Sequence, residues 1–222
     1  MHSLYDEFVA SLEKREKENC VKVCLDYLAN GAIDVVTLYE QILAPAMNTP
    51  SYGTNEGEVN IWEEHSRTSI VRTIIECCYP YVVKERNESY KSKKKGSVIV
   101  LCPTEEAHET GARMVADFFT VTGFDVIFIG ASTPGDQTID AINYFNPDYV
   151  AISITNAYNL LTTAKVVKKI TDMKNSMNFK IILGGRACQT NPETCKRMNP
   201  DYILQTFDDI RNLAEGEPDA AV

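Results

Sequence analysis

The fold is decided by the stretch Val98-Ile99-Val100-Leu101-Cys102-Pro103-Thr104-Glu105-Glu106-Ala107-His108-Glu109-Thr110-Gly111. Its apolar start is typical of a β-strand, and a polar segment with Glu-x-His-x-x-Gly spacing follows. A helical pattern then begins, with apolar side chains at Ala112, Val115, Ala116, Phe118 and Phe119. Ligands of open α/β sheets bind at the carboxyl ends of strands, where this polar segment is expected to lie. The stretch therefore predicts a strand, a candidate ligand-binding loop and a helix.

His108 has two interpretations at this point. A histidine with Glu106 two residues earlier suits a metal ligand that a carboxylate orients. Alternatively, the segment is only a helix start, where Glu105 and Glu106 favour the helix dipole and His108 faces solvent. The spacing alone leaves both open.

The second half of the chain alternates short apolar runs with helical stretches. Strands are expected at 98–101, 126–129, 149–154, 179–183 and 202–204. Helices are expected around 106–122, 135–146, 158–174 and 190–198, and a last one begins near Asp208. This alternation predicts an α/β fold: a doubly wound, five-stranded parallel sheet with helices on both faces.

The first half reads as helices only. Apolar residues follow helical spacing at Leu4, Phe8, Leu12, Val21, Cys24, Leu25 and Leu28. Asp34 is expected to cap a third helix. A long fourth helix should run from about Glu58 to Arg86, with Pro80 bending or breaking it. We predict a four-helix bundle domain over residues 1–90, a linker around 92–96, and the α/β domain over residues 97–216.

Composition excludes some functions. The net charge of −9 disfavours direct nucleic-acid binding, which needs a basic surface. No apolar run approaches the roughly 18 residues of a membrane span, and the N-terminal residues do not resemble a signal peptide. We expect a cytoplasmic protein without a membrane partner. Its seven cysteines contain no CxxC pair, so reduced thiols are expected and a zinc site is not.

Two other strand ends carry small or hydroxyl side chains. Ser153-Ile154-Thr155 closes the third strand, and Gly184-Gly185 follows the fourth. Glycines let a ligand approach the backbone closely, and hydroxyls can donate to it or accept from it. No GxGxxG phosphate motif is present. Together with His108, these loops predict a long ligand inserted edge-on at the sheet.

These residues resemble a known signature. His108 with Gly111, Ser153 with Thr155, and the Gly184-Gly185 pair resemble the motifs of the cobalamin-binding Rossmann-like, flavodoxin-like domain. The helical bundle resembles the cap domain of methionine synthase, corrinoid methyl-carrier proteins and light-sensing transcriptional regulators of the CarH type. The resemblance implies His108 as lower cobalt ligand, with Glu106 orienting its imidazole. It also implies a slot for the nucleotide tail, lined by Ser153, Thr155, Gly184 and Gly185.

The cap departs from the light-sensing branch. It keeps Glu64-His65, but Thr54 stands where the sensors have a tryptophan. Trp62 is too close to Glu64 to substitute and is interpreted as core packing. Tyr52 is the nearest aromatic residue on the preceding loop. The resemblance implies that Glu64, His65 and Tyr52 face the cofactor, with His65 as a candidate upper ligand.

Cys102 and Cys188 are expected at strand ends, facing the ligand cleft. They are either buried neutral thiols or groups that coordinate a metal or attach to a linear tetrapyrrole.

Three functions follow. The leading hypothesis is a non-catalytic cobalamin-binding sensor, responsive to light if the cofactor is adenosylcobalamin, without a DNA-binding domain of its own. It would signal through a protein partner or as a homo-oligomer. The second is a methyl-carrier subunit of a corrinoid methyltransferase, which would use methylcobalamin. The third is a photoreceptor holding a biliverdin-type bilin through a cysteine; a vestigial site would leave only a protein-interaction domain.

Overall fold

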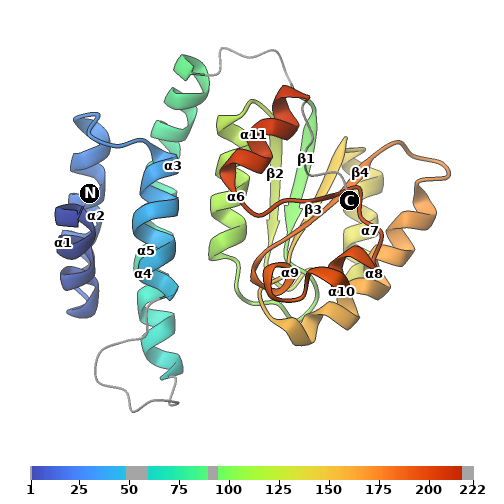
Figure 1. The fold of residues 1–222 in the computed structure, drawn as a ribbon, viewed down its shortest axis with the longest axis horizontal. Helices are drawn as coiled ribbons and strands as arrows, with labels where there is room; N and C mark the ends of the chain where they lie inside the picture. Colours follow the sequence, from blue (N-terminus) through green and yellow to red (C-terminus); the bar gives the residue numbers. More distant parts are fainter. Residues whose placement is uncertain (1, 49–59, 90–94, 217–222) are drawn as a thin grey trace. The chain divides into compact units, whose positions relative to one another are not determined.

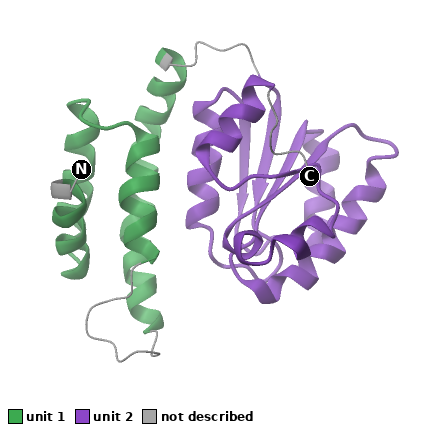
Figure 2. Cartoon of the chain, in the orientation of Figure 1, with its two compact units in different colours: residues 1–88 green, residues 89–222 purple. Residues whose placement is uncertain are grey.

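The computed structural model describes residues 2–48, 60–89 and 95–216 (Figure 1). The chain divides into two compact units, residues 1–88 and residues 89–222 (Figure 2). Each unit is described by itself below. Within the described ranges, no helix is both long enough and apolar enough to cross a bilayer.

Unit 1 is helical. Its elements are α1 (His2–Glu13), α2 (Lys17–Ala29), α3 (Val35–Thr37), the π-helical η1 (Leu38–Leu43), α4 (Ala44–Asn48) and α5 (Ile61–Ser89). Leu4, Phe8 and Leu12 of α1 are fully buried, as their spacing predicts. The side chain of Asp34 accepts a hydrogen bond from the Thr37 N–H at 2.7 Å, which confirms the expected cap.

Helix α5 buries one face and exposes the other. Ile70, Val71, Ile74, Cys78 and Val82 are buried at helical spacing. Pro80 lies on the exposed face and the helix continues past it, so the expected break does not occur. Proline has no N–H, so the backbone carbonyl of Glu76, one turn earlier, loses its helical donor. Because Glu76 is also exposed, this carbonyl can be hydrated.

Glu85 joins α5 to the start of α3. Its Oε1 accepts a hydrogen bond from the Val35 N–H at 2.7 Å. Burial raises the pKa of this carboxyl to about 7, although the Val35 hydrogen bond opposes the rise.

Unit 2 contains a five-stranded parallel sheet of order β2-β1-β3-β4-β5. The strands are β1 (Ser97–Leu101), β2 (Asp125–Gly130), β3 (Tyr149–Ser153), β4 (Lys180–Gly184) and β5 (Tyr202–Ile203). The helices are α6 (Thr110–Val121), α7 (Gly135–Phe145), η2 (Ala157–Asn159), α8 (Leu160–Met173), α9 (Arg186–Thr190), α10 (Pro192–Lys196) and α11 (Phe207–Glu215). The predicted fold class is confirmed. The direction in which successive strands are added to the sheet reverses between β1 and β3. This is the switch point at which doubly wound sheets bind ligands.

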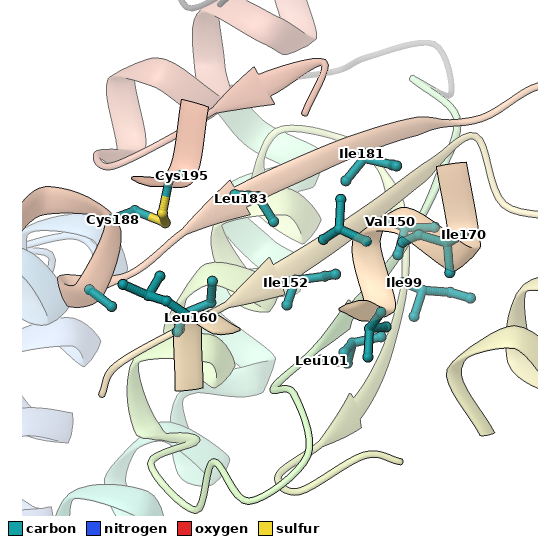
Figure 3. Close-up of a cluster of buried hydrophobic side chains, with 14 of the residues drawn as sticks. Ile99, Leu101, Val150, Ile152, Leu160, Ile170, Ile181, Leu183, Cys188 and Cys195 are labelled. Carbon is teal, nitrogen blue, oxygen red and sulfur yellow. A yellow bond between two sulfur atoms is a disulfide. The ribbon is translucent and has the colours of Figure 1, made fainter. Parts of the chain in front are cut away.

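Helices cover both faces of the sheet: α6 and α11 lie on one side, and α7 and α8 on the other (Figure 1). The face toward α7 and α8 holds a core to which the strands contribute every second residue (Figure 3). The strand members are Ile99, Leu101, Val150, Ile152, Ile181 and Leu183. This packing fixes the strand ends on which the polar loops are mounted.

Two details differ from the sequence-based expectations. Helix α6 begins at Thr110 and not near 106, because residues 102–109 form an extended loop at the sheet edge. The helix expected over 190–198 is replaced by the short α9 and α10.

The expectation of reduced thiols throughout is wrong. Cys188 of α9 and Cys195 of α10 form a disulfide, with a Cα–Cα distance of 5.6 Å (Figure 3). Their separation of seven residues does not predict this distance. It arises because two short helices fold back on each other at Asn191.

Candidate functional site

The candidate site lies at the carboxyl end of β1, where a loop carries Glu106 and His108 to the start of α6. Backbone hydrogen bonds attach this loop to the segment after β2. The Cys102 N–H donates to the Gly130 carbonyl at 2.9 Å, and the Ser132 N–H donates to the Glu106 carbonyl at 2.9 Å. The backbone of the loop is therefore fixed at its start and at Glu106.

Glu106 is a fully buried carboxylate surrounded by N–H donors. Its Oε2 accepts from the backbone N–H groups of Thr155 (3.1 Å) and Asn156 (2.8 Å), and from the side-chain Nδ2 of Asn159 (3.0 Å). Its Oε1 accepts from the backbone N–H of His108 at 3.2 Å. These contacts join the loop after β1 to the loop after β3 across the switch point.

Burial opposes ionisation of Glu106, but the hydrogen bonds from Asn156, Asn159 and His108 outweigh it and lower the pKa of the carboxyl below its ordinary value. The group is therefore an anion at neutral pH. An anion without water contact is tolerated here because N–H donors replace its hydration.

The imidazole of His108 is oriented by this anion. Its Nδ1 lies 2.7 Å from Glu106 Oε1, and the side chain is 43% exposed. Asn156 Nδ2 lies 3.0 Å from the same Nδ1 and also donates to the Tyr158 hydroxyl at 3.0 Å. A carboxylate can only accept, so in the bond to Glu106 Nδ1 carries the proton, and Nε2 carries the lone pair that can bind a metal. In this tautomer Asn156 Nδ2 donates to the Tyr158 hydroxyl and to Glu106 Oε1, which is 3.5 Å away, and not to Nδ1.

The three glycines of the predicted site have different structural roles. A Cβ on Gly111, in the first turn of α6, would meet nothing within 4 Å. A Cβ on Gly184 would come within 2.6 Å of the Leu204 carbonyl oxygen, and one on Gly185, where φ is +92°, within 2.5 Å of the Ile154 carbonyl oxygen. The glycine pair is thus required by close packing of the chain itself. Gly111 is not, which leaves space beside it for a ligand.

Ser153 and Thr155 lie next to the glycine pair. Ser153 is paired in register with Gly184, and Ile154 between them is bonded on both sides, to the Gly184 carbonyl and to the Ala187 N–H, each at 3.0 Å. The carboxyl ends of β3 and β4 therefore form one continuous edge of the sheet. This edge lies next to the end of β1, whose loop carries His108.

The two candidate cysteines do not offer reactive thiols at this edge. Cys102 is fully buried, and burial, with the charges of Glu106 and Glu109, raises the pKa of its thiol to about 12. Its Sγ lies 3.8 Å from the His108 carbonyl oxygen. Cys188 is 2% exposed and bonded to Cys195, so the expectation that it faces a cleft as a free thiol is wrong.

The cap residues belong to unit 1. Glu64 is half-buried and His65 is exposed, both in the first turns of α5. Trp62 is 66% exposed, so its interpretation as core packing is wrong. Tyr52 lies outside the described residues.

Sequence reasoning missed the amides that hold Glu106. Asn156 and Asn159 follow the Ser153-Ile154-Thr155 motif, but nothing in their spacing indicates which carboxylate they reach, because Glu106 is about 50 residues away in the chain. The only available signal was their position after the strand next to β1.

The donor set limits what metal can bind. Within the described ranges, no group of three or more His, Cys, Asp or Glu side chains is placed to hold a metal ion. A metal macrocycle arrives with most of its ligands already supplied, so one oriented imidazole is enough to bind it. The oriented imidazole, the buried anion behind it and the space beside Gly111 fit such a group.

Comparisons with known proteins agree with this geometry. Residues 96–212 match the B12 binding domain family. The chain is 24% identical over 123 residues to the methanol–corrinoid protein of Methanosarcina barkeri, a match that covers 54% of this chain and 42% of the relative. It is 20% identical over 175 residues to trimethylamine corrinoid protein 2 of Methanosarcina mazei, covering 79% of this chain and 78% of the relative.

A solved structure shares the fold. The monomethylamine corrinoid protein of Methanosarcina barkeri superposes with a TM-score of 0.79 at 13% identity, over 96% of this chain and 97% of the other. At this identity the likeness shows the fold, a helical region followed by a five-stranded parallel sheet with helices.

Proposed function

Because this chain belongs to the B12 binding domain family, we propose that it is a corrinoid protein that carries a methyl group for a methyltransferase partner. The observation that carries the proposal is the His108 imidazole fixed by the buried Glu106 carboxylate at the sheet's switch point. The names of the two relatives described above refer to methanol and to trimethylamine. We extend that class of small methylated donors to this chain.

The cofactor, when bound, supplies a cobalt atom that accepts and releases a methyl group. His108 Nε2 would ligate this cobalt. Glu106 keeps the proton on Nδ1 and holds the ring plane, as carboxylates do for metal-binding histidines. Gly111 lets the macrocycle approach the first turn of α6.

The nucleotide tail would follow the edge formed by β3 and β4. Ser153 and Thr155 offer hydroxyls there, and Gly184 and Gly185 keep the backbone free of side chains. In this proposal the groups that activate the methyl donor come from the partner enzyme, and this chain holds and presents the cofactor.

The test is reconstitution. The purified protein is mixed with hydroxocobalamin, and bound cofactor is measured by gel filtration and absorption. We expect one equivalent bound with histidine-ligated spectra. His108→Ala should lose the ligation signature, while the same change at His2, the first residue of α1, serves as the control. Methyl transfer from methanol or a methylamine is then assayed with a methyltransferase partner. Failure of the wild-type protein to bind hydroxocobalamin refutes the proposal.

The light-sensor hypothesis is tested with adenosylcobalamin in place of hydroxocobalamin. Protein loaded with adenosylcobalamin in the dark should change its oligomeric size on illumination if it is a sensor, and should keep its size if it is only a carrier. The bilin hypothesis finds no support at its two cysteines, because Cys102 is buried with a raised pKa and Cys188 is in a disulfide.

A further inference from the structure

Helices α7 and α8, which cover the same face of the sheet, expose large apolar side chains to solvent (Figure 1). Tyr144 is 82% exposed, Tyr158 70% and Leu161 76%, and Phe145 is also exposed. Within the described ranges, these are four of the seven exposed large hydrophobic side chains. Clusters of such side chains mark contact surfaces on soluble proteins. The outer surface of α7 and α8 is therefore a candidate contact surface.

The exposed side of α7 is acidic. Asp136 and Asp140 lie one turn apart, and Tyr144 follows one turn later. Gln137 Nε2 donates to Asp140 Oδ2 at 3.3 Å, but no cation in the described part of the chain pairs with either carboxylate. Asp136 and Asp140 form an acidic stripe that ends in the apolar Tyr144.

The exposed side of α8 is basic. Lys165, Lys168 and Lys169 are exposed at spacings of three and four residues, which places them on one side of the helix. None of them is in an ion pair with another described residue. This basic stripe lies between Leu161, one turn earlier, and Asp172. Three unpaired cations on one helix face are notable in a chain with a net charge of −9.

The two stripes lie beside each other. A Cβ on Gly135, at the start of α7, would come within 2.9 Å of Val166 Cγ2 in α8. Each helix returns from the carboxyl end of one parallel strand to the amino end of the next, so the two run in the same direction. Helix α7 thus begins level with the second turn of α8, and the acidic stripe lies next to the basic stripe.

We propose that this face binds a second copy of the chain, in a symmetric dimer in which the acidic stripe of each copy contacts the basic stripe of the other. A two-fold axis that runs along the helices, between α7 and α8, exchanges the two stripes and makes this contact twice. Opposite charges then face each other, and the apolar ends of the stripes lie within the contact. A nucleic acid or an anionic membrane would pair with the lysines but would be repelled by the carboxylates beside them. A second copy brings both signs of charge and matches the whole surface.

This symmetry determines how the candidate sites are presented. A rotation about an axis along the helices leaves the direction of the strands unchanged. The carboxyl ends of both sheets, and with them the two loops that carry His108, therefore lie at the same end of the dimer. The two stripes contain no residue of the candidate site, so the dimer forms with or without a bound corrinoid.

The experiment measures the molar mass of the cofactor-free protein by sedimentation velocity over a range of protein concentrations. At low ionic strength we expect twice the chain mass of 24.9 kDa, and a shift toward the monomer as salt is added. Lys165→Glu/Lys168→Glu should weaken dimerisation roughly 10- to 100-fold, and so should Asp136→Lys/Asp140→Lys. A chain with all four substitutions has the two charges exchanged and should dimerise again.

Lys14→Glu/Lys17→Glu in unit 1 is the matched control, because it makes the same change in net charge at exposed lysines outside the stripes. This variant should remain a dimer. A second measurement needs no variant: a carbodiimide joins lysines to carboxylates in contact, and a mixture of ¹⁴N- and ¹⁵N-labelled wild-type chains distinguishes cross-links between copies from those within one. We expect links between copies that join α7 to α8.

A wild-type protein that is monomeric at every concentration overturns the inference. A dimer without cross-links from α7 to α8 between copies does the same, as does one that persists after both stripe reversals. Loss of the dimer in the control, or no recovery in the chain with all four substitutions, would show that net charge and not the pairing of the stripes decides the association.

Discussion

Replacing Glu106 by glutamine tests whether its charge holds the imidazole. The two oxygens of Glu106 receive different donors: Oε1 faces the His108 backbone N–H and Nδ1, and Oε2 faces Thr155, Asn156 and Asn159. A glutamine must turn its NH₂ toward one of these groups. Oε1 receives the two longest N–H bonds, from the His108 backbone (3.2 Å) and from Asn156 Nδ2 (3.5 Å), and its third partner, Nδ1, can change from donor to acceptor. The amide nitrogen should therefore take the place of Oε1.

The cost follows from the lost contacts. The His108 N–H loses its acceptor, and the donors on Oε2 lose the negative charge that strengthens their bonds. Hydrogen bonds to a buried anion contribute about 1.5–3 kcal/mol each, so we expect Glu106→Gln to lower the free energy of unfolding by about 2–4 kcal/mol. For a unit of this size, that corresponds to a fall in melting temperature of roughly 10 °C.

The imidazole should respond as well. Facing an NH₂ group, Nδ1 must become an acceptor, which moves the proton of the neutral ring to Nε2 and removes the lone pair needed for cobalt. Long-range ¹H–¹⁵N NMR of the cofactor-free protein reads this tautomer directly, and thermal unfolding followed by circular dichroism reads the stability. Glu193→Gln, at an exposed α10 site, is the matched control and should change the unfolding free energy by less than about 0.5 kcal/mol. An unchanged tautomer together with an unchanged melting temperature would refute the role assigned to Glu106.

Three further predictions concern the rest of the chain. The pKa of Glu85 in the folded protein is raised to about 7, so its contribution to stability is present below pH 4.5 and is lost as pH rises to about 7. Glu85→Gln should remove this pH dependence. At pH 8, urea unfolding should show the variant unit 1 to be more stable by about 1–3 kcal/mol. Gly185→Ala should lower the free energy of unfolding by about 2–4 kcal/mol. Gly111→Ala should slightly raise the melting temperature of the cofactor-free protein but weaken hydroxocobalamin binding. Equal effects of the two substitutions would contradict the packing around these glycines. Peptide mapping without reductant should find Cys188 linked to Cys195, and reduction should lower the unfolding free energy by about 2 kcal/mol; detection of both as free thiols would exclude the bond.

Periodicity was sufficient for the fold because burial repeats along the chain. The alternating runs from Val98 onward predicted the parallel sheet, and the helical spacing of Leu4, Phe8 and Leu12 predicted a buried helix face. Periodicity was less informative where the structural effect of a residue depends on whether its side chain is exposed. Pro80 does not end α5 because it lies on the exposed face, and exposure of Trp62 could not be inferred from its residue type.

The Glu-x-His-x-x-Gly spacing placed His108 and Glu106 at a strand end, which the sequence determines locally. The partners of Glu106 were decided only by the tertiary structure. Strand order sets β3 beside β1, and this brings Asn156 and Asn159 to a carboxylate about 50 residues earlier in the chain. Parallel neighbours are separated by a crossover helix, so contacts between their loops have no signature in local spacing. The sequence thus predicted which side chain is the candidate metal ligand, and the packing of the strands determined how its imidazole is held.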